Sequence, residues 1–146
     1  MRTVLICIDL QVHSIHIARE ARKLLGNDDL VIHLLTVLPE VSVSPHVSGN
    51  QGQHELGKTL SHGQVEFKVV ADEVSHWGVP CERIQKKGDP VEHIVSTAKE
   101  IEADILVMGI KSHSALHHLI SGSVSGEVMD KLKTTPVLLV PVTSHS

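Results

Sequence analysis

The chain has 146 residues, of which 41% are hydrophobic, and a formal net charge of -4. A chain of this length buries about two thirds of its unfolded surface, so we expect a single domain over residues 1–146. An aromatic share of 1% and interspersed charges argue against nucleic acids and anionic membranes as partners, because these require stacking platforms or a basic patch.

The apolar run TVLICID at residues 3–9 is typical of a strand that is buried on both faces. It is too short for the apolar region of a secretory signal, and a membrane span needs roughly 20 residues. Cys7 and Cys81 lack the spacing of a disulfide framework or a zinc site. We therefore expect a cytoplasmic protein.

The rest of the chain alternates between helical and extended patterns. Gly26 and Asn27 end the first predicted helix, and Pro90 suits the first turn of a later one. Residues 39–52 form a loop that is longer than usual connections, so it is either a binding flap or a mobile segment. Helices are predicted at residues 13–25, 53–77, 90–101 and 122–132, and strands at 29–38, 81–87, 104–109 and 136–142.

This alternation predicts an α/β fold, in which right-handed crossovers build a mainly parallel sheet of five strands covered by four helices. Ligands of such sheets bind beyond the carboxyl ends of the strands, where the strand order reverses. The positions to inspect are therefore those after Asp9, Val37 and Met108, together with the KGDP turn at residues 87–90.

Two aspartates follow predicted strands. Asp9 is either a turn or helix-capping residue, or a carboxylate that accepts hydrogen bonds from the hydroxyl or amino groups of a ligand. Gly88, Asp89 and Pro90 are strong turn formers, so we interpret this tripeptide as the turn that starts a helix. Neither motif alone indicates a function.

The stretch MGIKSHSALHHLISGSVSGEV, residues 108–128, is the most specific candidate for a binding site. Gly109 follows a predicted buried strand, and a glycine lets the backbone approach a ligand closely. Residues 122–125 open a predicted helix, whose free N–H groups and positive dipole end favour an anion. The stretch either holds a phosphate or only caps the helix with a serine and turns the chain at Gly109.

The order LICID, HLLTVL, KGDP and ADILVMGIKSHSALHHLISGSVSGEVMDKLKTTPVLLVPV resembles the universal stress protein family across essentially the whole chain, most specifically over residues 103–140. Nucleotide-binding members carry glycine, two residues, glycine, nine residues and then glycine with serine or threonine. Gly109 and the pair Gly122 and Ser123 keep this spacing, but Ser112 stands at the middle glycine. The resemblance implies a Rossmann-like three-layer sandwich with strand order 3-2-1-4-5.

The resemblance also implies a bound adenine nucleotide, ATP or AMP, with Mg²⁺ or Mn²⁺. Asp9 and the backbone at Val37 would contact adenine and ribose, Met108 and Gly109 would line the nucleoside, and the remaining residues would surround the phosphates, with Lys111 adding a positive charge. Lys111 is added to this set for its positive charge and not from the resemblance. The residues expected to bind the nucleotide are Asp9, Val37, Met108, Gly109, Lys111, Ser112, Gly122, Ser123, Val124 and Ser125.

The chain departs from the family pattern at two places. Asp9 is followed by Leu10 and Gln11, where the family commonly has glycine and serine. Ser112 costs about 1 to 2 kcal/mol if its position requires a left-handed backbone. If it does not, the hydroxyl of Ser112 can donate a hydrogen bond to a phosphate.

We expect a regulatory module of the stress response that binds an adenine nucleotide and forms a homodimer through its last strand, at about Pro136 to Val140, as the resemblance implies. The chain has no Walker motif and no evident catalytic base, so we expect no catalysis beyond slow hydrolysis of a bound ATP. The alternative is a dimeric scaffold of the same fold that binds no nucleotide and acts through protein partners.

Histidines are numerous, with 12 in the chain. His113 and His117 lie four residues apart, a spacing at which two imidazoles on one helix face can hold Zn²⁺ or Ni²⁺. No carboxylate or thiol nearby completes such a site, so we predict surface histidines and no metal site. His33, within a predicted strand, is expected to be a core or edge residue.

Overall fold

A computed structural model describes residues 1–8, 14–26, 29–38, 67–111 and 124–142 of the chain. Within these ranges strands and helices alternate, as the sequence predicts. The strands are β1 (Arg2–Ile8), β2 (Leu30–Leu38), β3 (Cys81–Lys87), β4 (Ile105–Lys111) and β5 (Val137–Val142). The helices are α1 (Ser14–Leu25), α3 (Pro90–Glu100) and α5 (Val124–Lys131), and residues 67–75 are also helical.

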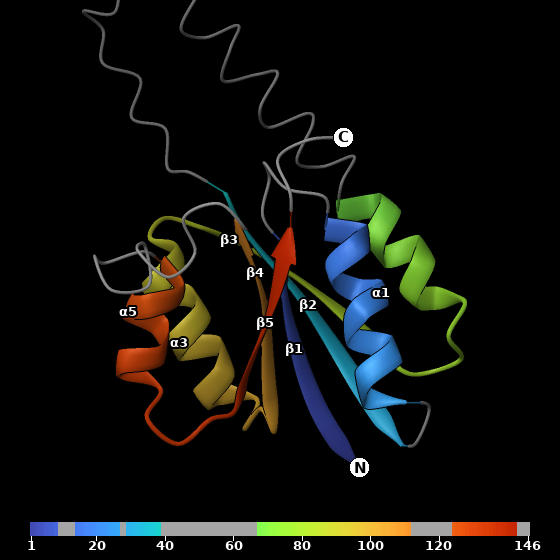
Figure 1. Cartoon of the computed structure of the whole chain (residues 1–146). Helices are drawn as coiled ribbons and strands as arrows, with labels where there is room; N and C mark the ends of the chain where they lie inside the picture. Colours follow the sequence, from blue (N-terminus) through green and yellow to red (C-terminus); the bar gives the residue numbers. More distant parts are fainter. Residues whose placement is uncertain (9–13, 27–28, 39–66, 112–123, 143–146) are drawn as a thin grey trace, which may run out of the picture.

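The five strands form one sheet in the order β3-β2-β1-β4-β5, and every neighbouring pair is parallel. This confirms the predicted α/β fold and its strand order. Because all strands run the same way, their carboxyl ends lie along one edge of the sheet, at the top of Figure 1. We refer to this edge as the carboxyl edge and to the opposite one as the amino edge.

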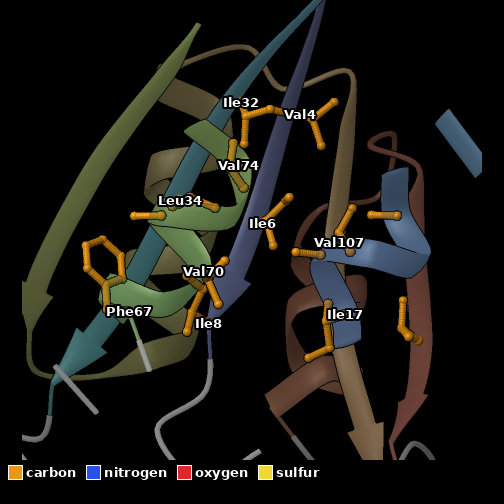
Figure 2. Close-up of a cluster of buried hydrophobic side chains, with 14 of the residues drawn as sticks. Val4, Ile6, Ile8, Ile17, Ile32, Leu34, Phe67, Val70, Val74 and Val107 are labelled. Carbon is orange, nitrogen blue, oxygen red and sulfur yellow. The ribbon is translucent and has the colours of Figure 1, made fainter. Parts of the chain in front are cut away.

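The helices cover both faces of the sheet. In Figure 1, α1 and the helical segment 67–75 lie on one side, and α3 and α5 lie on the other. The α1-side core, most of which Figure 2 shows, consists of Val4, Ile6, Ile8, Ile17, Ala18, Ala21, Leu30, Ile32, Leu34, Phe67, Val70, Ala71, Val74, Val107 and Val140. The α3-side core consists of Leu5, Leu35, Val91, Ile94, Val95, Ala98, Leu106, Met108, Val128 and Leu132.

Local signals in the sequence explain where helices begin and end. Gly26 ends α1 with φ of 72° and donates its N–H to the carbonyl of Arg22 at 3.0 Å. A glycine tolerates this left-handed backbone without strain. Asp89 caps α3, since its Oδ1 accepts the N–H of Val91 at 3.3 Å and Pro90 occupies the first turn. The structure thus confirms the interpretation of the GDP tripeptide as a helix-starting turn.

The predicted end of the fourth strand was wrong. We predicted that the fourth strand ends at Gly109, where the chain would turn outward, but β4 continues to Lys111. The reason lies in β5, which pairs with Gly109 through Val140 and with Lys111 through Val142. A partner strand that extends this far keeps the backbone of β4 in the sheet.

Candidate functional site at the carboxyl edge

The strand order reverses between β1 and β4, and their pairing is short. It runs from Val4 with Ile105 to Ile6 with Val107. On its other side β1 stays paired with β2 up to Ile8. Residues 108–111 of β4 therefore continue past the last pair with β1, at the place where ligands of parallel sheets bind.

Gly109 faces α1 from β4. A Cβ built on Gly109 would overlap Cδ1 of Ile17 and lie 3.2 Å from its Cγ1. Ile17 belongs to α1 and is fully buried. The packing of a helix against the sheet thus requires the absence of a side chain at Gly109, a reason that is independent of any ligand.

Met108 and Val37 direct their side chains to the other face of the sheet. Met108 is only 5% exposed and belongs to the α3-side core. Val37 is partly buried against the same core and pairs with Lys86 of β3. The side chain of Met108 is therefore occupied by packing, and the backbone is what it can offer a ligand.

Helix α5 begins with two residues of the predicted site. Because α5 follows a parallel strand and leads back to the next one, its amino-terminal end lies toward the carboxyl edge (Figure 1). Val124 is 41% exposed, whereas Ser125 is 7% exposed. Val128 and Leu132 anchor this part of the chain in the α3-side core.

The structure accordingly brings Val37, Met108, Gly109, Val124 and Ser125 to one edge of the sheet, on β2, β4 and α5. The other members of the predicted site are not placed. Asp9, Ser112, Gly122 and Ser123 lie outside the described residues, as does the side chain of Lys111, so their assignments stay predictions.

Three hydrogen bonds that the sequence reading missed hold the carboxyl ends of β1, β2 and β3. The hydroxyl of Thr36, which is buried, donates to the carbonyl of Ile8 at 3.4 Å. The N–H of Gly88 donates to the carbonyl of Leu38 at 3.0 Å. Nε2 of His93 in α3 donates to the carbonyl of Lys87, the last residue of β3, at 2.8 Å. In the sequence, these side-chain bonds were indicated only by a threonine inside an apolar run and by a histidine one turn after a helix cap.

Cys7, the cysteine nearest to the carboxyl edge, has an unreactive thiol. Cys7 in β1 packs against the α3-side core, and burial raises the pKa of its thiol far above the usual value. A thiol acts as a nucleophile only after it loses its proton. Cys7 is therefore a packing residue rather than a reactive one.

Membrane and metal features were sought in the described ranges. None of the helices there is long and apolar enough to cross a membrane. The same ranges contain no group of three or more His, Cys, Asp or Glu side chains that could hold a metal ion. His113 and His117 lie outside the described residues, so they are untested. His33 is in β2, where its Nδ1 lies 3.4 Å from Oε2 of Glu82 and its side chain is 12% exposed.

Comparisons with known proteins identify relatives. The model of the universal stress protein family matches residues 1–141. Universal stress protein MJ0531 of Methanocaldococcus jannaschii is 31% identical over 138 residues, which cover 92% of this chain and 75% of that protein.

Solved structures share the fold. A universal stress protein in complex with cAMP aligns with a TM-score of 0.69 and 22% identity, covering 95% of this chain and 96% of that one. A universal stress protein family protein from Arabidopsis thaliana with AMP bound aligns with a TM-score of 0.70 and 18% identity, covering 97% and 92%.

Proposed function

The chain belongs to the universal stress protein family, and from this premise we propose that it binds an adenine nucleotide at the carboxyl edge between β1 and β4. The observation that carries the proposal is the early end of the β1–β4 pairing. Within the described residues the last pair joins Ile6 with Val107, so residues 108–111 have no pairing partner in β1. Two structures of the same fold are complexes with cAMP and with AMP. They support the adenylate class of ligand.

Each side of the proposed site has a distinct task. Asp9 and the backbone of Val37 bind adenine and ribose, and the backbone of Met108 and Gly109 lines the nucleoside. The phosphates lie against the start of α5, where the positive end of the helix dipole favours an anion. The residues proposed for the phosphates are Lys111, Ser112, Gly122, Ser123, Val124 and Ser125.

ATP or AMP is the proposed ligand. With ATP, Mg²⁺ or Mn²⁺ would enter with the phosphates, whose oxygens are hard ligands suited to either ion. We assign no catalytic step to the site, because phosphoryl transfer requires a positioned base and a metal-bridged in-line geometry. Occupancy of the site is the proposed signal in a stress response, and the cytoplasmic location stays a prediction.

The proposed assembly is a homodimer through the last strand, at about Pro136 to Val140. Strand β5 is at the edge of the sheet, with β4 as its neighbour on one side. Val137, Leu138 and Leu139 are only partly buried, and an unpaired edge strand with apolar side chains is suited to a second copy.

The second candidate function is the scaffold that binds no nucleotide. It is favoured by one observation, which is Ser112 at the middle glycine of the phosphate motif. In that case the fold serves only to present its surfaces to protein partners. Ser112→Gly restores the family glycine and therefore separates the two candidates.

Isothermal titration of the nucleotide-stripped protein with ATP and Mg²⁺ tests the proposal, with AMP and GTP as comparison ligands. We expect saturable binding of the adenylates, and about tenfold tighter binding in Ser112→Gly if residue 112 is left-handed. A tenfold preference for ATP over GTP would support adenine recognition. Absence of binding in both proteins would overturn the proposal in favour of the scaffold.

A further inference from the structure

Gly109 and Ile17 form a contact that the proposed function does not use. Gly109 lies two residues after Val107, whose side chain belongs to the α1-side core, and it pairs with Val140 of the same core. Side chains alternate along a strand, so position 109 faces α1 as well. A Cβ at this position would therefore point at the helix and not beyond the carboxyl edge.

Ile17 fills the space that Gly109 leaves open. Figure 2 shows its side chain beside Val107, between α1 and β4. Ile17 is 0% exposed, and a Cβ on Gly109 would overlap its Cδ1 and lie 3.2 Å from its Cγ1. An isoleucine is stiff at χ1 in a helix because it is β-branched, and this fixes Cγ1. Cδ1 moves with χ2, but Ile17 is fully buried, so this rotation would displace the side chains that pack around it.

The other fully buried residues of α1 have small side chains, while Ile15 and Leu25 are partly buried against the same core. Ala18 and Ala21 are buried against the sheet, and alanines allow a helix to lie close. Ile17 is the one large side chain among the fully buried residues of α1, and it occupies the space that the missing side chain of Gly109 leaves. The pair fixes how α1 sits over β4, in the way that glycines permit close helix–strand packing in nucleotide-binding folds.

This contact joins the two sides of the proposed site. Helix α1 begins at Ser14, directly after residues 9–13, which open with Asp9. Strand β4 carries Met108 and Gly109, the proposed nucleoside contacts. Resting on the proposed function, we infer that Ile17 is a positioning residue that sets α1 relative to the carboxyl end of β4, and with it the backbone of Met108 and Gly109.

A methyl exchange between the two residues tests this inference. Gly109→Ala adds a methyl group where Ile17 lies, and Ile17→Val removes Cδ1, the atom that the new methyl would overlap. The double variant therefore keeps the total side-chain volume, and such exchanges are tolerated better than either change alone. Urea unfolding and ATP titration are measured on all four proteins.

We expect Gly109→Ala to lower the urea midpoint and to weaken ATP binding by about tenfold, a coupling typical of residues in direct contact. Ile17→Val should lose some stability and about threefold in affinity. The double variant should regain both the midpoint and the affinity that Gly109→Ala loses. Ile32→Val is the matched control, since Ile32 is buried in the same core on β2, and it should lose stability with unchanged affinity.

The outcomes distinguish the packing of Ile17 against Gly109 from the effect of this packing on ATP binding. A double variant that regains stability but not affinity would show that Gly109 acts on the ligand directly, and it would overturn the positioning role. A double variant as unstable as Gly109→Ala would contradict the packing of Ile17 in the space beside Gly109. A wild-type protein without ATP binding would remove the proposed function and the positioning role together, while the stability data would still test the packing of Ile17 against Gly109.

Discussion

Ile6 of β1 pairs with Val107 of β4, and among the residues that the structure describes this is the last pair between the two central strands. Beyond it β4 remains paired with β5 as far as Lys111. Residues 108–111 of β4 are thus paired with β5 but not with β1, at the point where the strand order reverses. This geometry is the basis for the proposed nucleotide site.

Asp9→Ala should weaken the binding of every adenosine-containing ligand by about tenfold or more. A carboxylate that accepts hydrogen bonds from ribose or adenine contributes about 1.5 to 3 kcal/mol. Titration calorimetry with ATP, AMP and adenosine gives the affinities. Asp130→Ala removes the same charge from an exposed position of α5 and should leave them unchanged; equal losses in the two variants would mean that only net charge matters.

Gly122→Val should abolish the affinity for ATP while sparing that for adenosine. In the proposed site a branched side chain at Gly122 would occupy the space of the phosphates. The proposed nucleoside contacts lie elsewhere, at Asp9, which follows β1, and on β2 and β4. Competition between labelled ATP and unlabelled adenosine measures both affinities on one protein. If the variant bound ATP as tightly as the wild type, the phosphates could not lie at the start of α5.

Asp89→Ala should lower the free energy of unfolding by about 0.5 to 2 kcal/mol, because it removes the cap of α3. The Oδ1 of Asp89 accepts the N–H of Val91 at 3.3 Å, and that N–H would lose its partner. Urea denaturation followed by circular dichroism measures the loss. Asp89→Ser keeps a capping oxygen and should retain most of the stability, so a serine variant as unstable as the alanine variant would argue against capping.

Cys7 should make the protein less stable at alkaline pH. Burial raises the pKa of its thiol in the folded state above the usual 9.0. Below pH 9 the thiol is protonated in both the folded and the unfolded chain, and its contribution is fully present. Above pH 9 the unfolded chain loses this proton and the folded chain keeps it, so the free energy of unfolding falls by about 1.4 kcal/mol per pH unit.

Urea midpoints between pH 8 and pH 10 test this slope, with Cys7→Ala as the comparison. The variant should show a shallower decline, whatever its stability at neutral pH. Cys81→Ser is a second comparison. Cys81 is exposed at the start of β3, and partial burial raises the pKa of its thiol against the opposing effect of Arg83, so this variant should change the slope less than Cys7→Ala. Identical slopes in the wild type and Cys7→Ala would contradict the burial of the Cys7 thiol.

Much of the fold can be predicted from the sequence, because the signals for its strands and helix ends are local. β-branched apolar runs indicate β1 and β2, and Gly26 and Asp89 mark a helix end and a helix start. The end of β4 was not predictable in this way, since it depends on Val140 and Val142 in another strand. When a strand end is set by the partner strand, the sequence of the strand itself does not indicate where it ends.

The candidate site was predicted only in part for the same reason. Its motif residues, such as Gly109, stand out by spacing, and the spacing suggested a ligand contact. The contact with Ile17 joins residues far apart in the chain, and only the packing of α1 on β4 reveals it. The hydrogen bonds of Thr36 and His93 could not be predicted, because a single polar residue in a strand or helix forms no distinctive pattern.

The most direct test of the account is a ¹H–¹⁵N titration of the protein with ATP and Mg²⁺, which reports on each backbone amide. We predict that the amides of Val37, Met108 and Gly109 shift in a saturable manner. The amides of Asp29 and Asp104, which precede β2 and β4 at the amino edge, should stay in place. Saturable shifts that occur at the amino edge and spare residues 108–111 would contradict a nucleotide site between β1 and β4.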